Sequence, residues 1–150
     1  MARKLRTKFD YRHKPALIIN RRAVRAERLV YVACANRPSK YRHGRSCIVY
    51  IGTTQAGAKR IADSAASKAG ELLRLPGVKS LQFYVVVCSP LPGVPSWELL
   101  ERALLLRFRM RFGDLPKCNT VGKNLKWDQD EKYFKHFTTK ALDKIIKEYN

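Results

Sequence analysis

The chain has 150 residues, a length that fits one compact domain whose core is large enough to fold without disulfides or metals. Its 31 lysines and arginines against 12 acidic residues give a net charge of +19, carried by a composition that is 45% apolar and therefore folded. We therefore expect a nucleic-acid partner. No apolar run approaches the ~20 residues that span a bilayer, and the N-terminus lacks the apolar core of a secretion signal. We expect an intracellular protein that does not enter a membrane.

The first 28 residues are expected to form a basic arm. Residues 1–25 hold nine lysines or arginines and a single acid, Asp10. Such dense positive charge is typical of a segment that contacts phosphates. Residues 29–150 are predicted to form one domain.

Two runs rich in β-branched and aromatic residues, 29–34 and 47–51, predict an antiparallel pair of strands. The basic segment 36–46 between them is expected to form a long loop.

A helix is predicted next, because apolar residues recur at helical spacing until Pro76 stops the pattern. Thr53 or Thr54 can cap it. The following run, 81–88, is almost entirely apolar, which predicts a central strand buried on both faces.

The second half of the chain is predicted to be helical. After the proline-rich connector 89–95, Ser96 is expected to cap a helix over 97–112 that Gly113 ends, and a last helix is predicted over 130–148. The order β-β-α-β-α-α predicts an α/β (α+β) fold, in which helices flank a small three-stranded sheet.

The cysteines are widely spaced and form no C-x-x-C pair, so we interpret them as structural thiols. They are Cys34, Cys47, Cys88 and Cys118.

Glu101 lies in the middle of the apolar helix 97–112. A buried carboxylate is costly unless it is paired or binds a cation. Glu101 is therefore either part of a salt bridge or a metal ligand.

A series of residues along the chain resembles the GIY-YIG nuclease family over roughly residues 29–124. The series is Tyr31 in Leu29-Val30-Tyr31, Tyr50 in Val49-Tyr50-Ile51-Gly52, Arg60 ten residues later, Glu101 in its helix, and Asn119. The Glu101 helix is particularly similar to that of the family's repair incision subunit. The resemblance implies a metal-dependent endonuclease that hydrolyses DNA phosphodiester bonds.

The resemblance also implies a role for each residue. Tyr31 and Tyr50 would surround and activate the attacking water, with a nearby cation easing proton loss. Arg60 would hold the scissile phosphate through its planar guanidinium. Glu101 would hold one divalent ion, most plausibly Mg²⁺ with Mn²⁺ as the alternative. Asn119 would orient the site.

Two points of the resemblance leave alternatives open. Asn124 replaces Asn119 if the alignment of that loop is shifted. Family members commonly carry a His or Tyr one helical turn after the arginine, where this chain has Ser64. Either the tyrosines act alone, or His43 substitutes as the base, or activity is weakened.

The remaining candidate residues are basic and would contact the DNA backbone, without reading its sequence. They are Arg21, Arg22, Arg37, Lys40, Arg42, His43, Arg45, Lys59, Arg107, Arg109 and Arg111. We expect a duplex substrate and a homodimer that cuts both strands; restriction, repair and mobile-element roles all remain open. The rival interpretations are a GIY-YIG-fold protein that binds nucleic acid with weak or no turnover, and an unrelated RNA-binding protein.

Deleting residues 1–25 is expected to weaken DNA binding and to flatten its salt dependence. Each lost phosphate contact should reduce the slope of log affinity against log salt by about 0.9. Binding titrations at several salt concentrations measure this slope, and an unchanged slope would show that the arm does not contact DNA.

Overall fold

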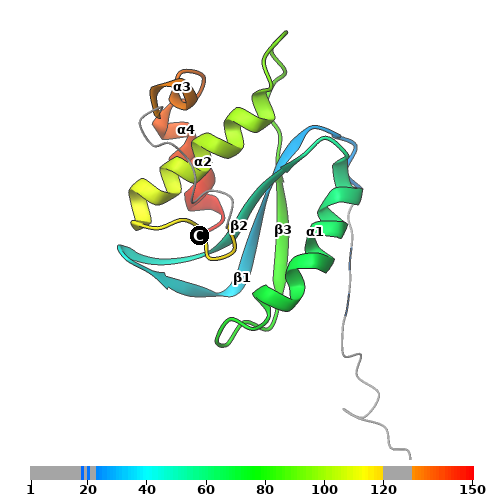
Figure 1. Cartoon of the computed structure of the whole chain (residues 1–150), viewed down its shortest axis with the longest axis vertical. Helices are drawn as coiled ribbons and strands as arrows, with labels where there is room; N and C mark the ends of the chain where they lie inside the picture. Colours follow the sequence, from blue (N-terminus) through cyan, green and yellow to red (C-terminus); the bar gives the residue numbers. More distant parts are fainter. Residues whose placement is uncertain (1–17, 19, 21–22, 120–129) are drawn as a thin grey trace, which may run out of the picture.

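The computed structural model describes residues 18, 20, 23–119 and 130–150. Most of the predicted arm, with Arg21 and Arg22, lies outside the described residues, as does Asn124. The described chain is an α+β fold in which a three-stranded antiparallel sheet carries α1 on one side and α2, α3 and α4 on the other (Figure 1). The predicted fold class is confirmed.

Strands β1 (Leu29–Tyr41) and β2 (Gly44–Thr54) form the predicted antiparallel pair, but both are longer than expected. The prediction of a long loop over 36–46 is wrong, since only Arg42 and His43 form the turn. The strands continue because Tyr41 is buried against aromatic side chains of α2 and donates its hydroxyl proton to the backbone carbonyl of Ile48 at 2.7 Å. A buried aromatic anchor here outweighs the polar composition of the segment.

The central strand is β1, and β3 (Leu81–Val86) lies at the edge of the sheet in the order β2-β1-β3. The prediction of a central, doubly buried strand over 81–88 is therefore wrong. Residues 29–35 of β1 are all buried, because helices cover both faces of that strand. In β3, by contrast, Gln82 and Tyr84 are exposed.

Helix α1 (Gly57–Leu72) begins after a turn in which the Thr54 hydroxyl accepts a hydrogen bond from the Ala56 amide at 2.9 Å. The threonine therefore organises the approach to the helix and does not cap it, since Ala56 occupies the capping position. The Gly57 amide donates to the carbonyl oxygen of Glu27 at 3.0 Å, which fixes the start of the helix beside the segment that enters β1.

Helix α2 (Ser96–Phe112) ends where predicted, at Gly113, whose φ of 76° is the left-handed conformation that glycine adopts easily. Pro95, rather than Ser96, precedes the first helical residue. The apolar side chains of α2 pack on β1 and β2 and on α4.

The predicted last helix is two helices, α3 (Asp130–Phe134) and α4 (Thr139–Glu148). They separate because Thr138 is extended and its hydroxyl accepts the Ala141 amide proton at 3.2 Å, which starts a new helix. Arg107 of α2 binds Asp143 of α4 through two hydrogen bonds of 2.8 and 2.7 Å. This pair lowers the pKa of Asp143 and gives Arg107 a structural partner, while its contact with a DNA phosphate stays a prediction.

All four cysteines are free thiols, as the sequence predicts. Burial raises the pKa of both Cys34 and Cys118 to about 12, so these two remain protonated. None of the described helices has the length and apolar character needed to cross a membrane.

Candidate active site

The two tyrosines of the resemblance meet across strands β1 and β2. Tyr31 pairs with Gly52 in the β1–β2 register, and the rings of Tyr31 and Tyr50 lie 5.9 Å apart between centroids. A Cβ atom on Gly52 would come within 2.7 Å of the Tyr50 ring and 2.8 Å of the Tyr31 hydroxyl. Gly52 therefore lies within a strand, not in a turn, and its missing side chain makes room for both phenols.

Ser64 of α1 binds the Tyr31 hydroxyl at 2.7 Å, and both residues are buried. Ser64 thus holds Tyr31 in place, and because the serine is buried it cannot contact a substrate. His43 cannot act in its stead, because it lies at the hairpin turn, roughly 30 Å along the strands from Tyr31 at ~3.3 Å per residue. The suggestion that His43 supplies the base is wrong.

Burial is the main cause that raises the pKa of the Tyr50 phenol above its ordinary value. Tyr31 raises it further, as does the negative charge of Glu101, whereas the positive charge of Arg60 lowers it. Tyr31 of β1, Arg60 of α1 and Glu101 of α2 therefore all lie within electrostatic reach of Tyr50 of β2. The phenol is neutral here, and its ionisation requires an additional cation.

Glu101 is largely buried, and burial raises the pKa of its carboxyl to about 7. The neighbouring Arg102 lowers this pKa and Glu98 raises it. Among the described residues, Glu101 makes neither a salt bridge nor a hydrogen bond. The salt-bridge interpretation therefore finds no partner in this part of the chain, and the carboxylate is available to a cation.

In the described part of the chain, no three His, Cys, Asp or Glu side chains come together as a metal-binding group. One carboxylate suits Mg²⁺, which usually keeps several waters and takes other oxygens from substrate phosphates. A magnesium ion at Glu101 would therefore bind to one protein ligand. Glu101 fits that chemistry as a half-buried oxygen donor without a competing partner in the described chain.

Asn119 clamps strand β2 next to Tyr50. Its side-chain oxygen accepts the Ile51 amide proton at 2.9 Å, and its side-chain nitrogen donates to the Ile51 carbonyl at 2.6 Å. Asn119 is buried. These two bonds fix the backbone between Tyr50 and Gly52, and the role of Asn119 in orienting an active site stays a prediction.

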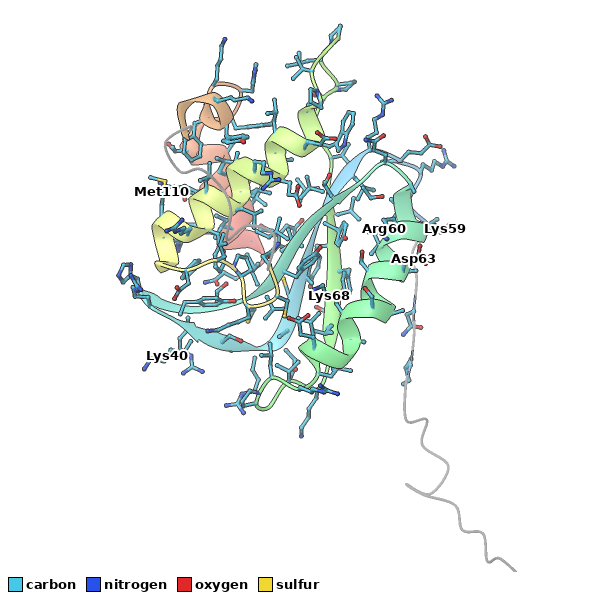
Figure 2. The ribbon with its side chains drawn as sticks, in the orientation of Figure 1. Lys40, Lys59, Arg60, Asp63, Lys68 and Met110 are labelled. Atoms are coloured by element: carbon cyan, nitrogen blue, oxygen red, sulfur yellow. The ribbon has the colours of Figure 1, made fainter. Side chains whose placement is uncertain are left out.

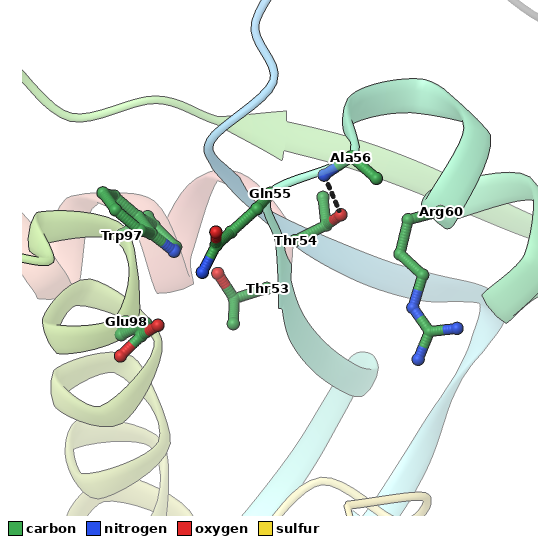
Figure 3. A pocket seen from close by; sticks show the side chains of 7 residues that line it. All are labelled: Thr53, Thr54, Gln55, Ala56, Arg60, Trp97 and Glu98. Atoms are coloured by element: carbon green, nitrogen blue, oxygen red, sulfur yellow. Dashed lines mark hydrogen bonds between the residues drawn. The ribbon is translucent and has the colours of Figure 1, made fainter.

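Arg60 is exposed on α1 and lies at a cleft of about 320 Å³ between the end of β2 and the start of α2. Figure 3 shows Arg60 on one side of this opening and Glu98 of α2 on the other. A phosphate at the cleft can therefore reach the guanidinium without displacing protein side chains.

Lys68 is a site residue that the sequence interpretation missed. Its ammonium lies 5.7 Å from the centroid of the Tyr50 ring and 3.1 Å from the Glu71 carboxylate. The signal was present, since Arg60, Ser64 and Lys68 are spaced by four residues and so share one face of a helix.

Most of the expected DNA contacts that the structure describes fall into two groups, one on α1 and one at the hairpin end. Lys59 lies on α1 beside Arg60, whereas Lys40 lies at the hairpin end of the molecule (Figure 2). At that end the hairpin turn is joined to the end of α2, because the His43 amide donates to Phe112 and the Arg42 amide to Asp114. The turn and helix end thus combine basic side chains from both elements: Arg42, Arg45, Arg109 and Arg111. Arg37, farther along β1, packs over Gly77.

Comparison of the chain with protein-family models, with curated proteins and with solved structures finds no match.

Gly52→Ala is expected to disrupt the site, because the new Cβ would lie within 2.8 Å of both tyrosine side chains. We expect a loss of about 1–3 kcal/mol in the free energy of unfolding, as for other overpacking substitutions. Gly70→Ala is the matched control: a Cβ on Gly70 meets nothing within 4 Å, and alanine favours a helix. Urea unfolding of both variants measures the difference, and equal stability would contradict the close approach.

The Glu101 carboxyl is expected to make stability depend on pH in metal-free buffer. Because its native pKa, about 7, exceeds the ordinary value of 4.5, its contribution is full below 4.5 and is lost as the pH rises through 7. Glu101→Gln should therefore exceed the wild type in unfolding free energy by roughly 2 kcal/mol at pH 8 and by little at pH 5. Denaturant titrations in EDTA test this, with the exposed Glu148→Gln as a control that should show no such trend.

Proposed function

We propose that this chain is an intracellular, metal-dependent endonuclease that hydrolyses phosphodiester bonds of duplex DNA with GIY-YIG chemistry. The observation that carries the proposal is the grouping of Tyr31, Arg60 and Glu101 around Tyr50, in which Glu101 is a half-buried carboxylate without a partner in the described chain. A salt-bridged glutamate would have had a structural explanation. An unpaired glutamate that acts on the same tyrosine as an exposed arginine fits a site that binds a cation and a phosphate.

In this proposal the protein residues divide the hydrolysis between them. Once nearby positive charge has lowered the pKa of Tyr50 and the phenol has lost its proton to solvent, the phenolate orients the attacking water and takes a proton from it. The water oxygen bonds to phosphorus while the bond from phosphorus to the leaving sugar oxygen breaks. Arg60 binds the non-bridging oxygens, where negative charge grows in the transition state. A divalent ion at Glu101 would supply further charge stabilisation at the phosphate.

Tyr31 and Ser64 support this chemistry without touching the phosphate. Their buried hydrogen bond of 2.7 Å fixes the Tyr31 ring, which in turn limits the positions open to Tyr50. Lys68 adds a positive charge above the Tyr50 ring at 5.7 Å. Tyr31 and Tyr50, with Lys68 above the Tyr50 ring, therefore take the role that a His or Tyr one helical turn after the arginine has in the family pattern.

The net charge of +19 supports a polyanionic substrate, and the basic hairpin and α2 end offer a second contact away from Arg60. With a single site per chain, cutting both strands requires a homodimer or two visits. We propose the homodimer.

A second candidate function is DNA binding by this fold with weak or no turnover. Ser64 favours it, because a buried serine that bonds Tyr31 cannot replace the general base of other family members. This candidate predicts tight binding and no metal-dependent product.

Incubating the protein with plasmid and short duplexes in Mg²⁺, and in EDTA as control, tests the two functions. We expect cleavage only with metal, a loss of at least a hundredfold in Glu101→Gln, and a loss of more than tenfold in Arg60→Lys, whose ammonium cannot make a two-pronged phosphate contact. Binding should persist in both variants. The neighbouring Lys59→Arg keeps the charge and serves as the matched control, since Lys59 is exposed outside the cleft. Parental rates in a folded Glu101→Gln protein would contradict the metal site.

A further inference from the structure

The cleft beside Arg60 contains a buried hydrogen-bond donor with no partner. Its lining includes Gln55, Trp97 and Glu98 in addition to Arg60. The indole nitrogen of Trp97 is buried and makes no hydrogen bond in the described structure. Figure 3 shows this nitrogen on the side of the ring that faces Gln55 and Thr53. A buried donor left unpaired costs roughly 1–3 kcal/mol, so its place in a cleft suggests that a ligand supplies the acceptor.

The other polar groups of the cleft complete a set of donors and acceptors. Gln55 is exposed, and its amide can both donate and accept. The exposed Glu98 carboxylate accepts only. Thr53 already donates its hydroxyl proton to the Leu29 carbonyl at 3.0 Å, so it is left as an acceptor. A ligand that presents both donors and acceptors along one edge matches this set.

The Trp97 ring is held in place by Arg28, whose guanidinium carbon lies 4.7 Å from the ring centroid. This cation lies over one face of the indole, and the N–H edge faces Gln55 and Thr53, which line the cleft (Figure 3). The Arg60 guanidinium supplies positive charge at the cleft. The arrangement therefore suits a planar polar ligand attached to an anion.

We propose that this cleft binds an unpaired nucleobase of the DNA strand, next to the phosphate that Arg60 holds. The proposal rests on the proposed cleavage of DNA at Arg60 and Glu101, and it names the kind of substrate that this site prefers. Every base presents hydrogen-bond donors or acceptors on its pairing edge once it is unpaired. The volume of about 320 Å³ lies within the ~300–1,000 Å³ range of ligand pockets, and Gln55, Glu98 and the Trp97 N–H line its polar end.

A paired base cannot enter the cleft without leaving the stack, which costs a few kcal/mol, and this cost is least when the base is already unpaired. Binding energy at the cleft therefore favours DNA that carries a bulge, a flap or a mismatch beside the cut. The substrate is then selected by its structure, with Trp97 and Gln55 as specificity residues and Arg60 as the phosphate contact.

Trp97 itself provides the readout. The chain has two tryptophans, and replacing the other one, Trp127→Phe, leaves Trp97 as the only source of indole emission. This protein is titrated in EDTA, so that nothing is cut, with duplexes carrying one bulged nucleotide, one bulged abasic residue, or no bulge. We expect the bulged nucleotide to change Trp97 emission and to bind at least threefold more tightly than the abasic duplex, which gives no such change.

Two variants separate the cleft from general DNA affinity. Gln55→Ala should remove the threefold preference and leave binding to the abasic duplex unchanged. Gln82→Ala, on the exposed edge of β3, removes the same chemical group outside the cleft and should have no effect. Trp97→Phe keeps a ring while deleting the donor, and should also weaken binding only where a base is present.

Equal affinities and equal emission for the bulged and abasic duplexes would overturn the proposal, even if the protein cuts DNA in Mg²⁺. A base-dependent emission change in a protein that cuts no DNA would uphold the base site and refute the nuclease function. Since binding is measured in EDTA and cleavage in Mg²⁺, the two failures are distinguishable.

Discussion

The candidate site depends on one electrostatic constraint: the Glu101 carboxyl is half-buried in an apolar helix without a salt bridge or hydrogen bond in the described chain. Burial raises its pKa to about 7, so the ionised form is costly at neutral pH unless a cation offsets the loss of water. The same negative charge raises the pKa of Tyr50. A cation bound at Glu101 would relieve both effects at once, and the two residues are therefore one coupled unit.

The rest of the fold holds this unit in place. Strand β1 lies at the centre of the sheet and brings Tyr31 against Tyr50, and only a glycine at position 52 leaves enough room between the strands. Ser64 secures one tyrosine from α1, while Asn119 secures the backbone beside the other. These contacts are buried and lie on regular elements, which limits the movement of the reacting groups.

Local patterns predicted the features that depend on neighbouring residues. The antiparallel pair, the extent of α2 and its end at Gly113 follow from short-range propensity and from glycine's left-handed conformation. The predicted central position of β3 was wrong because the order of strands in the sheet is not encoded in any local pattern. The long hairpin likewise depends on Tyr41 meeting aromatic residues of α2 far along the chain. The candidate site residues could be named from their order, and the spacing of Lys68 from Arg60 and Ser64 was visible in the sequence, but the contact of Lys68 with the Tyr50 ring and the unpaired Trp97 donor needed the fold.

The central claim is that Glu101 remains unpaired until a cation binds it. The direct measurement is the pKa of this carboxyl, followed by carbon NMR of labelled glutamate side chains, with Glu101→Gln identifying the signal. Without metal the account predicts a pKa near 7, and with saturating Mg²⁺ a decrease of at least one unit, because the ion favours the charged form. An ordinary pKa near 4.5 that does not respond to Mg²⁺ or Mn²⁺ would contradict it.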